Sequence, residues 1–184
     1  MDSSQKLTNT DVKKLNKNRI FRLIYNSDKI SRQEIADRLG LSLPTVNQNL
    51  KMLMEDGLIE YVGNFTSTGG RRAQAITISN NARKAISVNI KADYINVDVV
   101  GLKGQIIYSM DVKAHFNKSS VYIEKLTDAV RHAADYVGAD ADDILGVGVT
   151  VPGILDDEKQ ILISAPPLKA KNYDFTKLIS AIDY

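Results

Sequence analysis

Apolar residues recur with a helical period in the first part of the chain. The first such run comprises Leu15, Ile20, Leu23 and Ile24. This spacing predicts a helix over roughly residues 12–26. The polar residues 27–29 then interrupt the pattern, so we expect the helix to end before them.

A second helix is predicted to begin at Ser31, because serine is a favoured N-cap residue. Glu34 stands three residues later, as in a capping box. Ile30 and Ile35 hold the flanking positions of a hydrophobic staple. Gly40 supplies the C-terminal stop, so this helix is short.

A third helix is predicted from Ser42 to just before Gly57. Pro44 is compatible with its first turn, where the backbone amides have no acceptor inside the helix. Its buried stripe consists of Val46, Leu50 and Leu53. Two short helices joined by a tight turn at Gly40 form a helix-turn-helix.

The face opposite this stripe is mostly polar. Its residues are Pro44, Thr45, Gln48 and Lys51, with Asn47 and Asn49 on the flanks. Short hydroxyl and amide side chains suit hydrogen bonding to base edges and phosphates. The alternative is a solvated surface of a three-helix bundle, since amides are common on protein surfaces.

An alternating apolar pattern predicts two strands after the third helix, over roughly residues 58–62 and 73–78. The stretch between them reads NFTSTGGRR. It can be a solvated hairpin whose turn needs glycine, or a finger that enters a nucleic-acid groove. Its place directly after a recognition helix favours the second interpretation, the wing of a winged helix-turn-helix.

The wing tip combines backbone freedom with positive charge. Gly69 and Gly70 allow a bend and a close approach to DNA, and Arg71 and Arg72 can contact phosphates or a narrow minor groove. The predicted DNA-binding residues are therefore Ser31, Arg32, Ser42, Pro44, Thr45, Asn47, Gln48, Lys51, Gly69, Gly70, Arg71 and Arg72.

Charge and composition narrow the classes of function. Residues 1–80 hold 12 Lys/Arg and 8 Asp/Glu, whereas residues 81–184 hold 12 and 14, so the positive excess lies at the N-terminal side. The absence of cysteine excludes disulfides, thiolate metal sites and cysteine nucleophiles. No signal peptide or membrane span is predicted, and we expect a cytoplasmic protein.

The second half follows a different pattern. Two alternating segments, a turn at Gly101–Gly104 and a third alternating segment predict an antiparallel meander. An amphipathic helix follows, with its apolar side expected from Val121, Ile123, Leu126, Ala129, Val130 and Ala133. The apolar run DDILGVGVTV then predicts a buried strand parallel to the first. The order is βββαβ.

Both halves resemble the ROK family of repressors and kinases. The segments that carry the resemblance are SRQEIADRLGLSLPTVNQNLKMLMEDGLIEYVG, STGGRRAQAITIS, AISVNIKADYINVDVVGLKGQII and ILGVGVTVPGILDDEKQILISAPPL. The resemblance implies an α+β chain. A winged helix-turn-helix DNA-binding domain would span residues 1–80. An incomplete first lobe of a ribonuclease-H-like (actin-like) domain would span residues 81–184.

The sequence departs from the family's kinases at the phosphate-binding turn. Where they carry D-x-G-G-T, this chain reads NIKAD over residues 89–93, without either glycine. We therefore expect no ATP binding, no catalytic residues and no cofactor. The resemblance carries over Gly153 as a sugar-cleft contact, whereas Pro166, Pro167 and Leu168 lack the family's asparagine. The acidic runs near residues 140 and 157 are expected to be solvated, so no metal site is predicted.

The resulting expectation is a DNA-binding transcriptional regulator, a repressor of carbohydrate-metabolism genes. It would bind double-stranded DNA at a palindromic operator as a homodimer, and would respond to a sugar if a second lobe is supplied. Two alternatives stay open from the sequence: a ligand-independent dimeric DNA-binding module, and a fragment of a sugar kinase.

Overall fold

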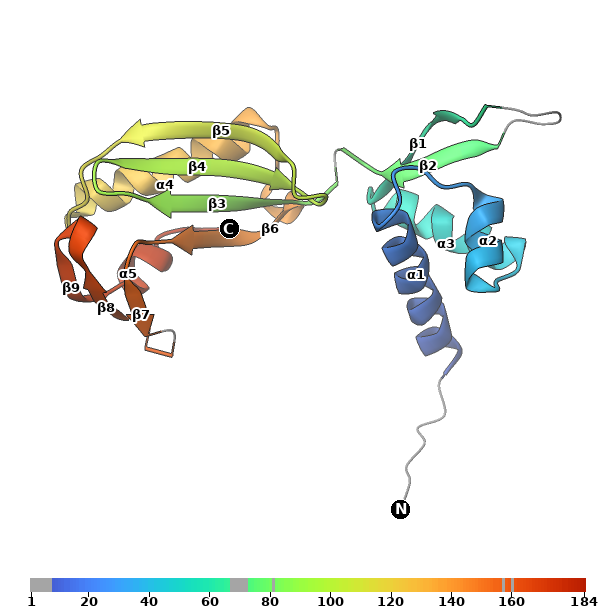
Figure 1. Cartoon of the computed structure of the whole chain (residues 1–184), viewed down its shortest axis with the longest axis horizontal. Helices are drawn as coiled ribbons and strands as arrows, with labels where there is room; N and C mark the ends of the chain where they lie inside the picture. Colours follow the sequence, from blue (N-terminus) through green and yellow to red (C-terminus); the bar gives the residue numbers. More distant parts are fainter. Residues whose placement is uncertain (1–7, 67–72, 81, 157, 160) are drawn as a thin grey trace, which may run out of the picture. The chain divides into compact units, whose positions relative to one another are not determined.

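The computed structural model describes residues 8–66, 73–80, 82–156, 158–159 and 161–184 (Figure 1). The chain divides into two compact units, Met1–Ala82 and Arg83–Tyr184. Each unit has its own buried apolar residues, so each is built around its own core.

The first unit is a three-helix bundle with a two-stranded hairpin. Its elements are α1 (Asn9–Tyr25), α2 (Arg32–Leu39), α3 (Leu43–Glu55), β1 (Ile59–Asn64) and β2 (Gln74–Ile78). The strands are antiparallel, with Ile59 opposite Ile78. Ile30 joins the hairpin through two backbone hydrogen bonds to Ile76, of 3.0 and 2.9 Å. The arrangement is a winged helix-turn-helix, as the sequence predicts.

Local capping explains why the helices begin and end where they do. α1 begins earlier than the apolar period indicates, because Thr8 and Asp11 form a complete capping box. At α2 the Ser31 hydroxyl accepts from the Glu34 amide at 3.2 Å. The reciprocal half of the predicted box is not seen in the described residues, and the Glu34 carboxylate pairs with Arg38 at 2.7 Å.

The core of the first unit comes from isoleucines and leucines at the predicted spacing. Ile20, Ile24, Ile30 and Ile35 are fully buried, together with Val46, Leu50, Leu53 and Ile76. Leu15, which the sequence pattern groups with them, is 48% exposed, because it lies nine residues before Ile24 and so points to the opposite side of α1. Ile30 and Ile35 form the predicted hydrophobic staple. Because Ile30 is also paired with Ile76, the staple holds the start of α2 against β2.

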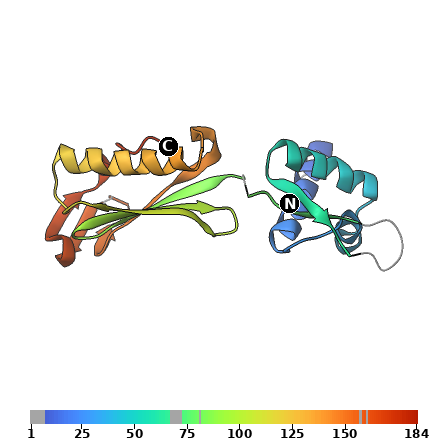
Figure 2. The same ribbon diagram turned by 90° about the horizontal axis from the view of Figure 1, so that it is seen from above.

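The second unit is a four-stranded sheet covered on one face by a helix. Its elements are β3 (Lys84–Ile90), β4 (Tyr94–Gly101), β5 (Ile106–Lys113), α4 (Ser120–Tyr136) and β6 (Ile144–Thr150). The strand order is β5-β4-β3-β6, and β3 and β6 are parallel. Figure 2 shows α4 lying along one face of this sheet. These elements confirm the predicted α+β class and the βββαβ order.

A smaller sheet completes the second unit. It contains β7 (Ile154–Asp156), β8 (Ile161–Ala165) and β9 (Ala170–Asp174) in antiparallel order. Short 3-10 turns η1 (Ala141–Asp143) and η2 (Pro166–Leu168) precede β6 and β9, and α5 (Thr176–Ile179) follows β9. Leu162 and Leu178 from this part join the main core.

Two expectations about burial in the second unit are wrong. α4 buries Tyr122, Leu126, Ala129, Val130, Ala133 and Ala134, whereas Val121 is 58% exposed. Tyr122 takes the inner position because it stands four residues before Leu126 and seven before Ala129, and its ring packs edge-on against Phe116, 5.3 Å between centroids. In β6 only Ile144 is buried and Leu145 is 62% exposed, because β6 forms an edge of the described sheet.

Candidate nucleic-acid interface

Helix α3 presents most of the predicted reading residues to solvent. Its start is fixed by Ser42, whose hydroxyl accepts from the Thr45 amide at 3.4 Å and lies 2.9 Å from the Thr45 hydroxyl. Pro44 occupies the first turn, as predicted. The exposed residues of the predicted set on this helix are Pro44, Asn47, Gln48 and Lys51, and Thr45 is half-buried.

Asn49 does not lie on this surface, contrary to the expectation from the sequence. Its side chain is 2% exposed, and its Nδ2 donates to the Thr45 carbonyl at 2.8 Å. Asn49 stands three residues after Val46 and four before Leu53, so it borders the buried stripe, on the side of α3 that α1 approaches. Its Oδ1 has no hydrogen-bond donor among the described residues.

Ser31, Ser42 and Lys51 each have an internal partner as well as access to solvent. The Ser31 hydroxyl accepts from a cap amide, which leaves its proton available to an external acceptor such as a phosphate, whereas the Ser42 hydroxyl also shares a hydrogen bond with the Thr45 hydroxyl. Lys51 lies 3.7 Å from Glu55, and both side chains are exposed. An exposed pair of this kind contributes little, so Lys51 can turn toward an anion.

Arg32 joins α2, α3 and the wing. Its guanidinium donates to Gln74 Oε1 at 2.8 Å and to Asn47 Oδ1 at 3.4 Å, and it lies 5.9 Å from the centre of the Tyr61 ring. Because both amide oxygens face the guanidinium, the NH₂ groups of Asn47 and Gln74 remain available as donors. This hydrogen-bond network fixes the position of the wing relative to the reading helix.

A groove of about 690 Å³ lies around this network. Its lining residues are Ser31, Arg32, Gln33, Leu43, Asn47, Asn64, Ala73 and Gln74. None of them is acidic, and several offer hydrogen-bond donors. An anion with several oxygen acceptors, such as the phosphate backbone of a nucleic acid, matches this lining.

The sequence does not single out Gln74, Asn64 or Leu43 for this site. Gln74 stands in an alternating strand, where it resembles any solvent-facing position. Leu43 stands three residues before Val46, the first residue of the buried stripe, yet it is 42% exposed. An exposed leucine at the start of a reading helix can contact a thymine methyl group. Gly69, Gly70, Arg71 and Arg72 lie outside the described residues.

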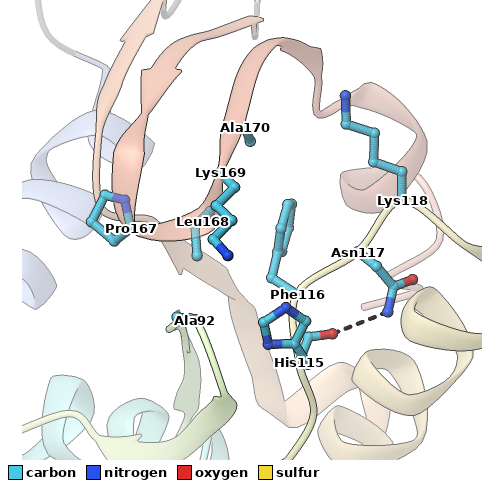
Figure 3. Close-up of a pocket in the computed structure, with 9 residues that line it drawn as sticks. All are labelled: Ala92, His115, Phe116, Asn117, Lys118, Pro167, Leu168, Lys169 and Ala170. Carbon is cyan, nitrogen blue, oxygen red and sulfur yellow. Dashed lines mark hydrogen bonds between the residues drawn. The ribbon is translucent and has the colours of Figure 1, made fainter.

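The second unit contains a smaller cavity, of about 260 Å³, where three loops meet (Figure 3). Its floor is formed by Phe116, Leu168 and Ala170, all nearly buried. Figure 3 shows the Lys169 side chain beside Leu168, whereas the Lys118 side chain extends away from the other labelled residues. The Lys118 ammonium lies 5.1 Å from the Tyr173 ring centre. His115 is engaged with Asp93 at 2.8 Å.

The turn that replaces the phosphate-binding motif forms one wall of this cavity. The carbonyl of Ala92 accepts from the Phe116 amide at 2.9 Å, and that of Asp93 accepts from the Ala114 amide at 3.0 Å. The two residues that replace the motif's glycines, Lys91 and Ala92, carry side chains at this point. Pro167 and Leu168 line the opposite wall.

Gly153 has a packing reason to be glycine. A Cβ at this position would collide with the Ser164 carbonyl oxygen and would lie 2.9 Å from the Ala165 Cβ. The residue therefore allows β7 to lie close against β8. Its predicted contact with a sugar remains a prediction.

Near this cavity, burial raises the pKa of Tyr122 to about 12, and Tyr173 adds to this shift.

Among the residues that the structure describes, no three carboxylates or imidazoles are arranged to hold a metal ion. None of the described helices is long and apolar enough to cross a membrane.

Comparison with known proteins agrees with this architecture. Residues 15–60 match the family described as winged helix-turn-helix DNA-binding, and residues 85–182 match the ROK family. The chain belongs to the ROK family. The second match covers more than half of the chain and includes the whole βββαβ arrangement except the first residue of β3.

The curated relatives of this ROK chain include named sugar repressors. It is 28% identical over 157 residues to the xylose repressor of Bacillus subtilis, covering 84% of this chain and 40% of that protein. It is 25% identical over 168 residues to the DNA-binding transcriptional dual regulator NagC of Escherichia coli, covering 91% and 41%. The chain thus spans about two fifths of the length of these relatives.

A solved structure shares the fold across most of the chain. It is a ROK family transcriptional regulator, described as a homolog of the Escherichia coli MLC protein. The TM-score is 0.58 at 19% identity, with 92% of this chain and 43% of that chain covered. At this identity the likeness supports the fold alone.

Proposed function

We propose that this ROK chain is a DNA-binding transcriptional regulator that represses genes of carbohydrate metabolism. The observation that carries the proposal is the exposed polar face of α3 beside the groove around Arg32. Base-reading side chains and phosphate-binding donors adjoin there on one surface. The proposed base-contacting residues are Pro44, Thr45, Asn47 and Gln48, and the proposed backbone contacts are Ser31, Arg32, Ser42, Lys51, Gly69, Gly70, Arg71 and Arg72.

The DNA partner is proposed to be a palindromic operator bound by two copies of the chain. In such a dimer two recognition helices enter successive major grooves, about 34 Å apart. The names xylose repressor and N-acetylglucosamine repressor, the latter given to relatives in Escherichia coli, support a sugar-linked repressor, and the winged helix-turn-helix match supports a DNA-binding regulator over a kinase.

Selection of bound duplexes from a random DNA pool tests this proposal. The pool is incubated with the purified chain at two salt concentrations, and the retained sequences are read. Enrichment of one palindrome at both salt concentrations, with half-sites about one helical turn apart, is the expected result. Retention without enrichment, lost uniformly as salt rises, would leave only non-specific binding and would contradict the proposal.

A sugar effector is the proposed ligand of the second unit. The relatives' names and the cavity beside Pro167 and Leu168 support it. Xylose and N-acetylglucosamine can be added to the operator complex, and release of DNA by one of them is expected. If neither changes binding by this chain, the ligand-independent dimeric module becomes the better description of it.

A sugar kinase is the enzymatic alternative. It requires a phosphate-binding turn whose backbone can approach a nucleotide, and the side chains of Lys91 and Ala92 oppose such an approach. We therefore propose that this chain is not an enzyme. Sugar-dependent ATP turnover across a sugar panel would contradict that.

A further inference from the structure

Helix α3 borders a second groove, formed with the first half of α1. This groove has a volume of about 300 Å³ and is lined by Asn9, Val12, Lys13, Asn16, Thr45, Gln48 and Asn49. The groove around Arg32 is lined by Leu43 and Asn47 instead. Residues two apart on a helix, such as Asn47 and Asn49, point about 200° apart, so the two grooves flank α3 on different sides.

The lining of this second groove suits an anion. It contains one ammonium group, several side-chain amides and a hydroxyl, and no acidic side chain. In the described part of the chain Lys13 has no carboxylate partner. The nearest acidic residue in sequence, Asp11, accepts from the Thr8 amide at 2.9 Å and from the Thr8 hydroxyl at 2.7 Å. The hydrogen bond from the Thr8 hydroxyl lowers the pKa of the Asp11 carboxyl most, and the bond from the Thr8 amide adds to this effect.

The Asn49 amide lines the groove but offers no exposed donor to an anion. It lines the groove while being 2% exposed, and its Nδ2 is held by the Thr45 carbonyl at 2.8 Å. Its Oδ1 is a buried acceptor without a donor among the described residues. A phosphate offers only acceptors and cannot satisfy this oxygen, so the anion-binding character of the groove comes from Lys13, Asn16 and Gln48 rather than from Asn49.

Helix α1 is anchored in the first unit by its middle and its second half. Ile20 and Ile24 are fully buried, and Lys17 pairs with Asp56 just beyond the end of α3. Thr45 and Gln48 belong both to this groove and to the reading face. A duplex that presents its major groove to Gln48 therefore also brings its backbone toward Lys13.

We propose that this groove is a second binding site for the DNA backbone, in which Lys13 contacts a phosphate and Asn16 lies at the rim. The proposal rests on the proposed DNA-binding function. The recognition helix is then flanked by two phosphate contacts, one from the Arg32 groove and one from α1. The α1 contact would place Gln48 at a fixed depth in the major groove.

Two adjacent lysines provide a matched test. Lys13→Ala and Lys14→Ala each remove one positive charge from the same helix, but Lys14 does not line the groove. Loss of one phosphate contact makes the slope of log K against log salt less steep by about 0.9 for each protomer. At 0.15 M salt the same loss weakens binding about fivefold for each protomer. We expect this for Lys13→Ala, little change for Lys14→Ala, and recovery in Lys13→Arg. Fluorescence anisotropy on the selected duplex measures all three.

A second pair separates a local contact from overall charge. Asn16→Asp places a carboxylate at the rim of the groove, whereas Asn18→Asp places one on α1 away from it. Both substitutions change the net charge by the same amount, so any general charge effect on DNA affinity is shared. Only Asn16→Asp should cause an additional loss of affinity. If Lys13→Ala equals Lys14→Ala, or Asn16→Asp equals Asn18→Asp, while the unaltered chain still binds its operator, the α1 site is refuted and the proposed function stands. If the unaltered chain selects no sequence, the proposed function itself fails.

Discussion

The two units arrange their polar side chains in different ways. In the first unit, polar side chains from α2, α3 and the wing converge on exposed grooves, and Arg32 orients two amides so that their donors remain available. In the second unit, two polar side chains that line the cavity already have partners: His115 bonds to Asp93, and Asn117 accepts from the Ser119 amide. The first arrangement fits a large anionic partner. The second fits a small ligand or none.

The largest predicted effect belongs to the wing tip. Arg71→Ala combined with Arg72→Ala removes two proposed charge-assisted contacts, each worth about 1.5–3 kcal/mol. We expect operator binding to weaken roughly a hundredfold or more, and the salt slope to fall by about 1.8 per protomer. Titrations at several salt concentrations measure both quantities. An unchanged affinity and slope would mean that the tip does not touch DNA.

A substitution in the second unit should leave the reading surface intact. Gly153→Ala introduces a methyl group against the Ser164 carbonyl, and overpacking of this kind costs about 1–3 kcal/mol. Thermal unfolding should show a loss of stability of about 2 kcal/mol, whereas base preference in the DNA selection stays the same. A change in base preference would contradict the proposal that only the first unit reads the DNA sequence.

Arg32 should matter more than another arginine on the same helix. Arg32→Ala removes the hydrogen bonds to Gln74 and Asn47 as well as a proposed phosphate contact, so we expect affinity to fall about tenfold. Arg38 pairs with Glu34 on α2 and serves as the control. If Arg38→Ala weakens binding equally, the groove has no special role. Arg32→Lys should not restore binding, because lysine lacks the planar fork.

The smallest predicted effect concerns sequence preference. Gln48→Ala should reduce discrimination at one base position by about 1 kcal/mol, with a smaller loss of overall affinity. Affinities for the operator and its single-base variants measure this directly. An unchanged preference at every position would remove Gln48 from the reading face.

Local features of the fold were predictable from the sequence, because their physics lies within a few residues. Serine caps at Ser31 and Ser42 and the glycine stop at Gly40 depend only on neighbouring backbone groups, and the structure has them where predicted. The helix-turn-helix and the hairpin follow from such local signals. The parallel pairing of β3 with β6 follows from the βββαβ order.

Features that depend on distant segments were not predictable in this way. Arg32 bonds to Gln74, 42 positions away in the chain, so no short pattern can reveal the pair. Asn49 borders the buried stripe of α3, three residues after Val46 and four before Leu53, but only the approach of α1 on that side decides that a polar residue there is covered.

The most direct test of the central claim is methylation interference at guanine N7 on the selected operator. A recognition helix inserted in the major groove contacts this atom, whereas a protein bound only to phosphates or to the minor groove does not. Two clusters of interfering guanines, about 10 base pairs apart, are the predicted result. Binding that is unaffected by methylation of every guanine in both half-sites would contradict the claim that α3 reads bases.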